Sequence, residues 1–154
     1  MKRAIVGVAL LVVGCIGAID PFDPEVGAPT SARCDDADSD PDTDVSYAMH
    51  IAPLIRGEVM GTPGCSCHLP TSATPIGLEQ TGLDLSTIDG IRAGGGRSRG
   101  TAAIPGQPCS SLIVQKIGPA PPVGARMPFN GPPYLSAETQ QLIADWIAEG
   151  ALEN

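Results

Sequence analysis

Two thiols and one imidazole lie within four consecutive residues of the chain. Cys65 and Cys67 are separated by a single serine, and His68 follows Cys67 directly, in the segment GTPGCSCHLP. In an exported protein, a cysteine followed directly by a histidine indicates covalent attachment of a c-type haem. In that chemistry the thiol bonds to a vinyl group of the haem and the histidine ligates the iron from one side.

The spacing departs from the complete attachment motif, which is Cys-x-x-Cys-His. Gly64 occupies the position of the first cysteine, and Cys65 comes one residue too late. We therefore predict one haem c, attached by a single thioether through Cys67, with His68 as the proximal iron ligand. Cys65 is the second choice for a thioether.

The first 15 residues carry the features of an export signal. Lys2 and Arg3 precede an apolar stretch over residues 4–13, which is too short to span a bilayer. It ends in Val-Val-Gly-Cys, which resembles the lipobox of bacterial lipoproteins. We expect a signal peptide over 1–14, lipidation of Cys15 and a bacterial protein anchored by its lipid to a membrane, in the periplasm or at the cell surface. A cleavable signal with an incidental cysteine is the alternative.

Residues 15–44 are expected to form a flexible, disordered acidic tether ahead of a domain over 45–154. Prolines punctuate this segment and few large apolar groups occur in it. Aspartates alternate with other residues at positions 36, 38, 40, 42 and 44. Alternating carboxylates could gather a calcium ion, but the glycine and the bidentate glutamate of an EF-hand loop are missing. A solvated spacer is the better interpretation.

Composition limits the partners and the core. The formal net charge is −8, which argues against nucleic acid as a partner because few cations are present to neutralise phosphates. The 154 residues contain five aromatic side chains, so the polypeptide is poor in the groups that usually build a core. A bound haem would supply apolar volume, whereas a loop-rich domain held by disulfides is the alternative.

Apolar periodicity predicts a mainly α fold with helices near both ends of the domain. The first lies within 45–60, and Pro53 is tolerable there in a first helical turn. The second begins after Ser136 as N-cap and stops at Gly150. The expected apolar positions are Tyr47, Ile51, Leu54, Ile55 and Val59 in the first helix, and Leu142, Ile143, Trp146 and Ile147 in the second.

The order of motifs over 45–154 resembles the cytochrome-c-like lipoproteins of myxobacteria and planctomycetes. The haem motif is followed by GLDLS (82–86), by PGQPCSSLIVQKI, by Met127-Pro128 and by a closing Trp-Ile-Ala-Glu-Gly-Ala helix. The resemblance implies a small, loop-rich, cytochrome-c-like helical domain in which the two terminal helices cross. It also implies Met127 as the second axial ligand of the iron, since class I cytochromes commonly use a Met-Pro methionine. His50 is the competing ligand.

Three cysteines remain once Cys15 and Cys67 are assigned. An oxidising compartment disfavours free thiols, and we prefer a disulfide between Cys65 and Cys109, which would join the haem-motif loop to the loop of Pro105 and Gly106. A bond between Cys34 and Cys109 is the open alternative, because spacing does not determine connectivity.

The segment RAGGGRSRG (92–100) is expected to be a flexible loop. A sharper hypothesis pairs Arg92, Arg97 or Arg99 with haem propionates or with an acidic redox partner.

Three functions follow from these observations. The first is a monohaem electron carrier without catalytic residues, which passes electrons between redox partner proteins. The second is a haem-free, disulfide-stabilised lipoprotein with a role in interaction or structure. The third is an enzyme such as a peroxidase, which would require an open iron site and is supported by no acid–base pair.

Overall fold

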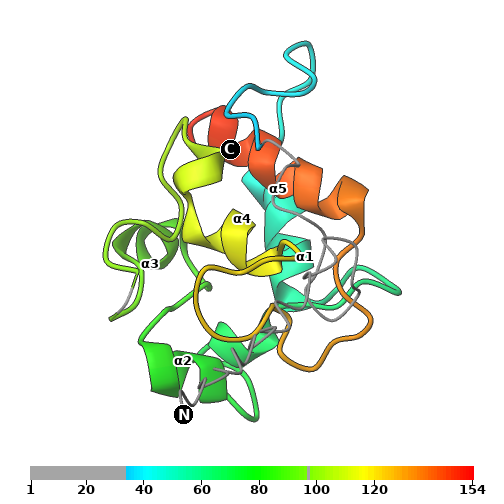
Figure 1. The fold of residues 1–154 in the computed structure, drawn as a ribbon. Coiled ribbons are helices and arrows are strands. Elements are labelled where there is room, and N and C mark those ends of the chain that lie inside the picture. Colours follow the sequence, from blue (N-terminus) through cyan, green and yellow to red (C-terminus); the bar gives the residue numbers. More distant parts are fainter. Residues whose placement is uncertain (1–33, 97) are drawn as a thin grey trace, which may run out of the picture.

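The computed structural model describes residues 34–96 and 98–154, and within these ranges the chain forms helices joined by long loops, with no strand. The mainly helical, loop-rich fold is therefore confirmed (Figure 1). No helix in the described part of the chain is long and apolar enough to cross a bilayer. In chain order the elements are η1 (Tyr47–Ile51), α1 (Ala52–Arg56), η2 (Ser66–His68), α2 (Ile76–Thr81), α3 (Ile88–Ala93), η3 (Pro108–Ser110), α4 (Leu112–Ile117) and α5 (Ala137–Ala148).

The N-terminal helix consists of a π-helical turn, η1, that continues into α1. Its first turn is capped by Ser46, whose hydroxyl accepts a hydrogen bond from the backbone N–H of Met49 at 3.2 Å. Pro53 lies in the first turn of α1, as expected. The helix ends at Gly57, which has φ +73°. Val59 therefore lies beyond the helix and is 37% exposed, so its predicted place in the first helix was wrong.

The C-terminal helix α5 agrees with its sequence signals. The Ser136 side chain accepts a hydrogen bond from the backbone N–H of Thr139 at 3.2 Å, and Gly150 follows the helix with φ +107°. The predicted buried positions include Trp146, which is 1% exposed. The ring of Trp146 lies 5.7 Å from that of Tyr47, centroid to centroid. The C-terminal helix therefore packs against the N-terminal helix, as predicted, with the contact at η1.

One hydrophobic cluster forms the core of the described residues, between these helices and the loops. Its large aromatic members are Tyr47 and Trp146, whereas Phe129 is 77% exposed. Isoleucine and leucine side chains supply most of the remaining apolar volume. The buried members are Val45, Tyr47, Ile51, Ala52, Ile55, Leu69, Leu85, Ile88, Ile91, Ala103, Ile117, Leu135, Ile143, Trp146, Ile147 and Ala151.

Residues 34–44 are bound to the domain, so the prediction that a free tether extends to residue 44 was wrong over this stretch. The backbone N–H and the hydroxyl of Ser39 donate to the carboxylate of Asp145 at 2.9 and 2.7 Å. The backbone N–H of Cys109 donates to a carboxylate oxygen of Asp36 at 2.8 Å. The proposed signal peptide, Cys15 and the rest of the predicted tether lie outside the described residues.

The disulfide joins Cys34 to Cys109, with their Cα atoms 5.5 Å apart. The preferred pairing of Cys65 with Cys109 was wrong, and the alternative pairing is the one observed. The physical reason lies in where Cys65 is held. Its backbone N–H donates to the carbonyl of Ile55 at 2.8 Å, and its side chain packs against the core.

Removal of this disulfide should destabilise the domain. The bond closes a loop with a sequence separation of 75 residues, and its loss in the Cys34→Ser variant should lower the free energy of unfolding by about 2–4 kcal/mol. Urea denaturation of Cys34→Ser beside wild type measures this difference, and Met60→Ala is the control because the Met60 side chain is 99% exposed. If Cys109 were bonded to Cys65, the Cys34→Ser substitution would leave the unfolding midpoint unchanged.

Candidate functional site

The thiol–imidazole segment forms a single 3-10 turn, η2, fastened to the domain on both sides. At its start, the backbone N–H of Cys65 donates to the carbonyl of Ile55 at the end of α1, at 2.8 Å. At its end, the carbonyl of His68 accepts from the backbone N–H of Leu85 at 3.1 Å. The turn therefore lies between α1 and the loop that carries the Gly-Leu-Asp-Leu-Ser sequence.

The His68 ring is oriented by a backbone carbonyl. Its Nδ1 atom lies 3.2 Å from the carbonyl oxygen of Leu83, which can only accept a hydrogen bond. Nδ1 must therefore carry the proton in this contact, and the lone pair of the neutral ring is on Nε2. Burial lowers the pKa of His68, and the hydrogen bond to Leu83 opposes this effect. The arrangement is the one by which outer partners orient metal-ligating histidines.

The helix α2 covers the opposite edge of the same ring. A methyl group built on Gly77 would lie 2.7 Å from Nε2 of His68, and 2.9 Å from each of the two ring carbons beside it. These separations are too short for any side chain, so only glycine allows the α2 backbone to pack against the imidazole. Nε2 consequently faces the backbone of α2.

The two thiols of the motif are free and differ in exposure. Cys67 is exposed, whereas Cys65 is partly buried and packs against the core cluster. Burial raises the pKa of the Cys65 thiol to about 11, with a smaller contribution from the negative charge of Cys67. Of the two, Cys67 is therefore the more accessible to a covalent partner.

Met127 lies on the loop that follows α4 and is partly buried against the core cluster. Its backbone N–H donates to the carbonyl of Lys116 at 2.8 Å. The Nζ of Lys116 donates in turn to the carbonyl oxygens of Val123 (2.6 Å) and Ala125. One lysine at the end of α4 thus holds both the loop and the methionine at its far end.

The two predicted iron ligands, His68 and Met127, have different neighbours in the structure. His68 contacts Leu83 and faces Gly77, whereas Met127 is tied to Lys116 and packs against the same cluster as Cys65. His50, the competing ligand, uses its Nδ1 to accept a hydrogen bond from the backbone N–H of Ser46 at 3.1 Å.

The two arginines of the glycine-rich loop that the structure describes, Arg92 and Arg99, form no hydrogen bond or ion pair at this site. Arg92 donates from Nη2 to the carbonyl of Ala151 at 2.8 Å, which ties the loop to the C-terminal tail. Arg99 is exposed, and Arg97 lies outside the described residues.

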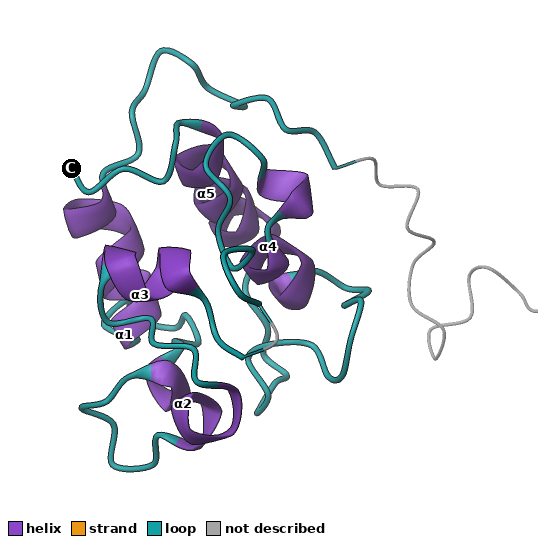
Figure 2. Ribbon diagram, turned by 90° about the vertical axis from the view of Figure 1, so that its left-hand side faces the viewer, coloured by secondary structure: helices purple, strands orange, loops and turns teal. Residues whose placement is uncertain are grey.

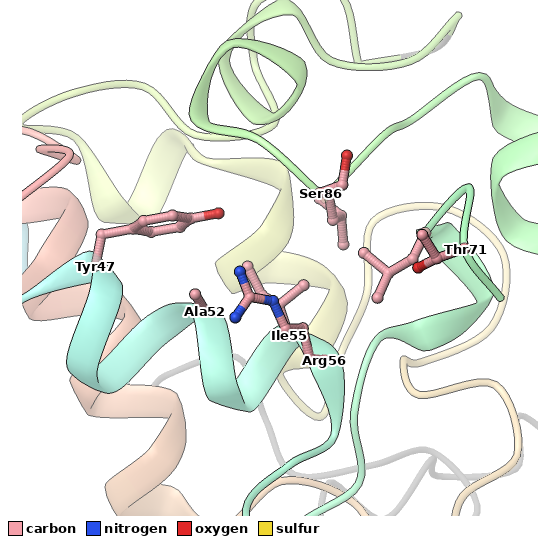
Figure 3. A pocket seen from close by; sticks show the side chains of 8 residues that line it. Tyr47, Ala52, Ile55, Arg56, Thr71 and Ser86 are labelled. Atoms are coloured by element: carbon pink, nitrogen blue, oxygen red, sulfur yellow. The ribbon is translucent and has the colours of Figure 1, made fainter.

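A cavity of about 240 Å³ adjoins the motif. Figure 3 shows it between α1 and the segments that carry Thr71 and Ser86, with Tyr47 and Arg56 reaching toward it from the helix. Its volume is below the 300–1,000 Å³ of usual ligand pockets. The lining residues are Tyr47, Ala52, Ile55, Arg56, Leu69, Thr71, Leu85 and Ser86.

The side chains present fit a covalently attached haem. The space in front of His68 Nε2 can admit one only if α2 moves. The exposed thiol of Cys67 precedes the imidazole of His68, whose Nδ1 is hydrogen-bonded. Nε2 is therefore the nitrogen available to ligate a metal. The position in front of Nε2 is taken by the backbone at Gly77. Elsewhere in residues 34–96 and 98–154, no group of three or more histidine, cysteine, aspartate or glutamate side chains is placed to hold a metal ion.

No protein-family model, curated protein or solved structure matches the chain significantly.

Two residues that shape this site were not singled out from the sequence. Leu83 acts through its main-chain carbonyl, which no side-chain motif encodes, although it lies in the GLDLS segment (82–86) noted in the sequence. Gly77 did carry a signal, because a glycine within a helix marks close packing. The partner of that packing was not deducible from one sequence.

The two thiols should differ strongly in reactivity. Since the thiolate is the nucleophile and the pKa of Cys65 is about 11, roughly a thousandth of Cys65 would be ionised at pH 8. We expect maleimide to label Cys67 first, with Cys65 reacting only as the pH approaches 11. Timed labelling followed by peptide mass spectrometry measures both rates, and labelling in denaturant is the control. Equal native rates at pH 8 would contradict the described burial.

Proposed function

We propose that this chain is an exported, lipid-anchored electron-transfer protein with one haem c. Cys67 attaches the haem by a single thioether, His68 is the proximal iron ligand, and Met127 is the second axial ligand. Redox proteins of the same compartment are the partners, and the chain carries no catalytic residue of its own.

The observation that carries the proposal is the contact between His68 Nδ1 and the Leu83 carbonyl, at 3.2 Å. A buried core histidine needs no particular nitrogen free, whereas a metal ligand must present an unprotonated one. In the neutral ring, this contact leaves Nε2 unprotonated. The neighbouring Cys67 adds an exposed thiol that belongs to no disulfide.

The proposed pair of iron ligands is suited to an electron carrier and not to an enzyme. When bound, haem supplies a reversible one-electron couple, whose potential a thioether ligand raises. His68 and Met127 together would fill both axial positions and leave no open site for oxygen or peroxide. Lys116 would keep Met127 in place through the backbone of its loop.

The haem-free lipoprotein is the second candidate, and one observation favours it. The α2 backbone closes the Nε2 side of His68, and the cavity that adjoins the motif has a volume of only about 240 Å³. On this hypothesis, the Cys34–Cys109 disulfide supplies stability that a haem would otherwise provide.

Expression in a bacterial host with cytochrome maturation genes separates the two candidates. We expect a coloured protein whose intact mass includes one haem. The Cys67→Ala variant should lose the covalent haem, because its thiol forms the thioether, while Cys65→Ala should retain it. Visible spectra and intact mass of the three proteins are the measurements.

The outcomes of that experiment lead to different conclusions. A colourless wild type that unfolds cooperatively with apo mass supports the haem-free candidate and ends the electron-transfer proposal. A covalent haem that survives Cys67→Ala but is lost in Cys65→Ala would reverse the assignment of the thioether.

Substitution of Met127 tests the second axial ligand. In Met127→Ala we expect the sulfur-to-iron charge-transfer band to disappear and the reduction potential to fall, since a thioether sulfur is lost. Met60→Ala is the matched control, because Met60 is 99% exposed. Absorption spectra and potentiometric titration give both readouts, and a wild type without the band would show that another group ligates the iron.

A further inference from the structure

The helix α2 stands apart from the other helices. In both views it lies at the bottom of the molecule, below the other labelled helices (Figures 1 and 2). It buries no residue, and its main contacts with other helical elements are with η2. Its position therefore depends on its two ends and on the ring of His68.

The C-terminal end of α2 is anchored by the glycine-rich loop. The carbonyl of Thr81 accepts a hydrogen bond from the backbone N–H of Gly96 at 2.7 Å. A side chain on Gly95 would collide with the Thr81 carbonyl and with the backbone of Leu83, so only glycine permits this approach. Gly82, with φ +67°, ends the helix directly beside the anchor.

The N-terminal end of α2 is held more loosely. Gly77 meets the imidazole of His68 there, and Ile76 beside it is 53% exposed. Pro75 precedes the helix and its side chain forms no capping hydrogen bond. A helix of six residues is marginal without tertiary support. Movement of this end would break the packing against His68 but leave the Thr81–Gly96 hydrogen bond in place.

We propose that α2 is a hinged cover over His68, closed through Gly77 in the haem-free protein and pivoting at Thr81–Gly82 to expose Nε2 when iron is bound. This inference rests on the proposed function, because it names how access to the same ligand is regulated. The glycine-rich loop 94–96 serves as the fixed support of the hinge. The closed cover keeps the imidazole shielded until a haem is presented.

Histidine modification of the haem-free protein tests the cover directly. The chain has two histidines, so His50 is an internal reference for the reagent diethyl pyrocarbonate. In wild type we expect His68 to be modified more slowly than His50, since Nε2 faces Gly77. In Gly77→Ala the added methyl group cannot fit against the ring, and the His68 rate should rise about tenfold. Ile76→Ala, on the exposed side of the same helix, should leave it unchanged.

A second measurement covers the case in which Gly77→Ala fails to fold, which a raised His50 rate would reveal. Amide hydrogen exchange of the wild type should then show residues 76–81 exchanging at least tenfold faster than α5, through local opening. Equal rates for His68 and His50 in wild type would overturn the proposal, as would an unchanged His68 rate in a folded Gly77→Ala. Exchange of α2 at the rate of α5 would also overturn it.

These readouts are independent of the proposed function, because none of them uses haem. If Gly77→Ala exposes a shielded His68 but the protein never acquires haem, the proposed cover stands and the electron-transfer proposal fails. If the wild type acquires haem but His68 is already accessible in its haem-free form, the electron-transfer proposal stands and the proposed cover fails.

Discussion

The burial of Trp146 near the end of α5 is the constraint on which the rest of the domain depends. Its ring packs on Tyr47, and its Nε1 donates to the carbonyl of Leu152 at 2.9 Å. The preceding residue, Asp145, accepts both hydrogen bonds from Ser39, and the following carbonyl, of Ile147, accepts from Gly106. One turn of α5, the longest helix in the described part of the chain, thus forms hydrogen bonds with the segment around Ser39, with the C-terminal tail at Leu152 and with the loop at Gly106.

The candidate site lies outside this well-packed region, and that location explains its character. Cys65 belongs to the edge of the core and has a raised pKa, whereas two and three residues later the chain presents an exposed thiol and a half-buried ring. At this edge of the core, the His68 ring keeps a fixed orientation while the helix that covers it, α2, buries no side chain of its own. Elements of low local stability are typical of regions that must move when a ligand binds.

Sequence patterns predicted the parts of the fold that depend on local physics. The apolar stripe, N-cap and terminal glycine of α5 all agreed with the structure, because these signals act within one helix. The end of the first helix and the disulfide were predicted wrongly for the opposite reason. Gly57 outweighed the apolar residue two positions beyond it, and the pairing of Cys109 depends on where a distant segment lies. The motif at Cys67 and His68 was evident, but Gly77 and the Leu83 carbonyl reach His68 only through the fold.

The docking of Cys34 onto Cys109 also limits how far the domain can stand from a membrane. If Cys15 carries the lipid, as proposed, the 19 residues from Ile16 to Cys34 are the whole length of chain between the anchor and the disulfide. Fully stretched, such a segment spans at most about 65 Å. The protein would then work within a shallow layer above the lipid surface, and any electron donor or acceptor would have to extend into that layer.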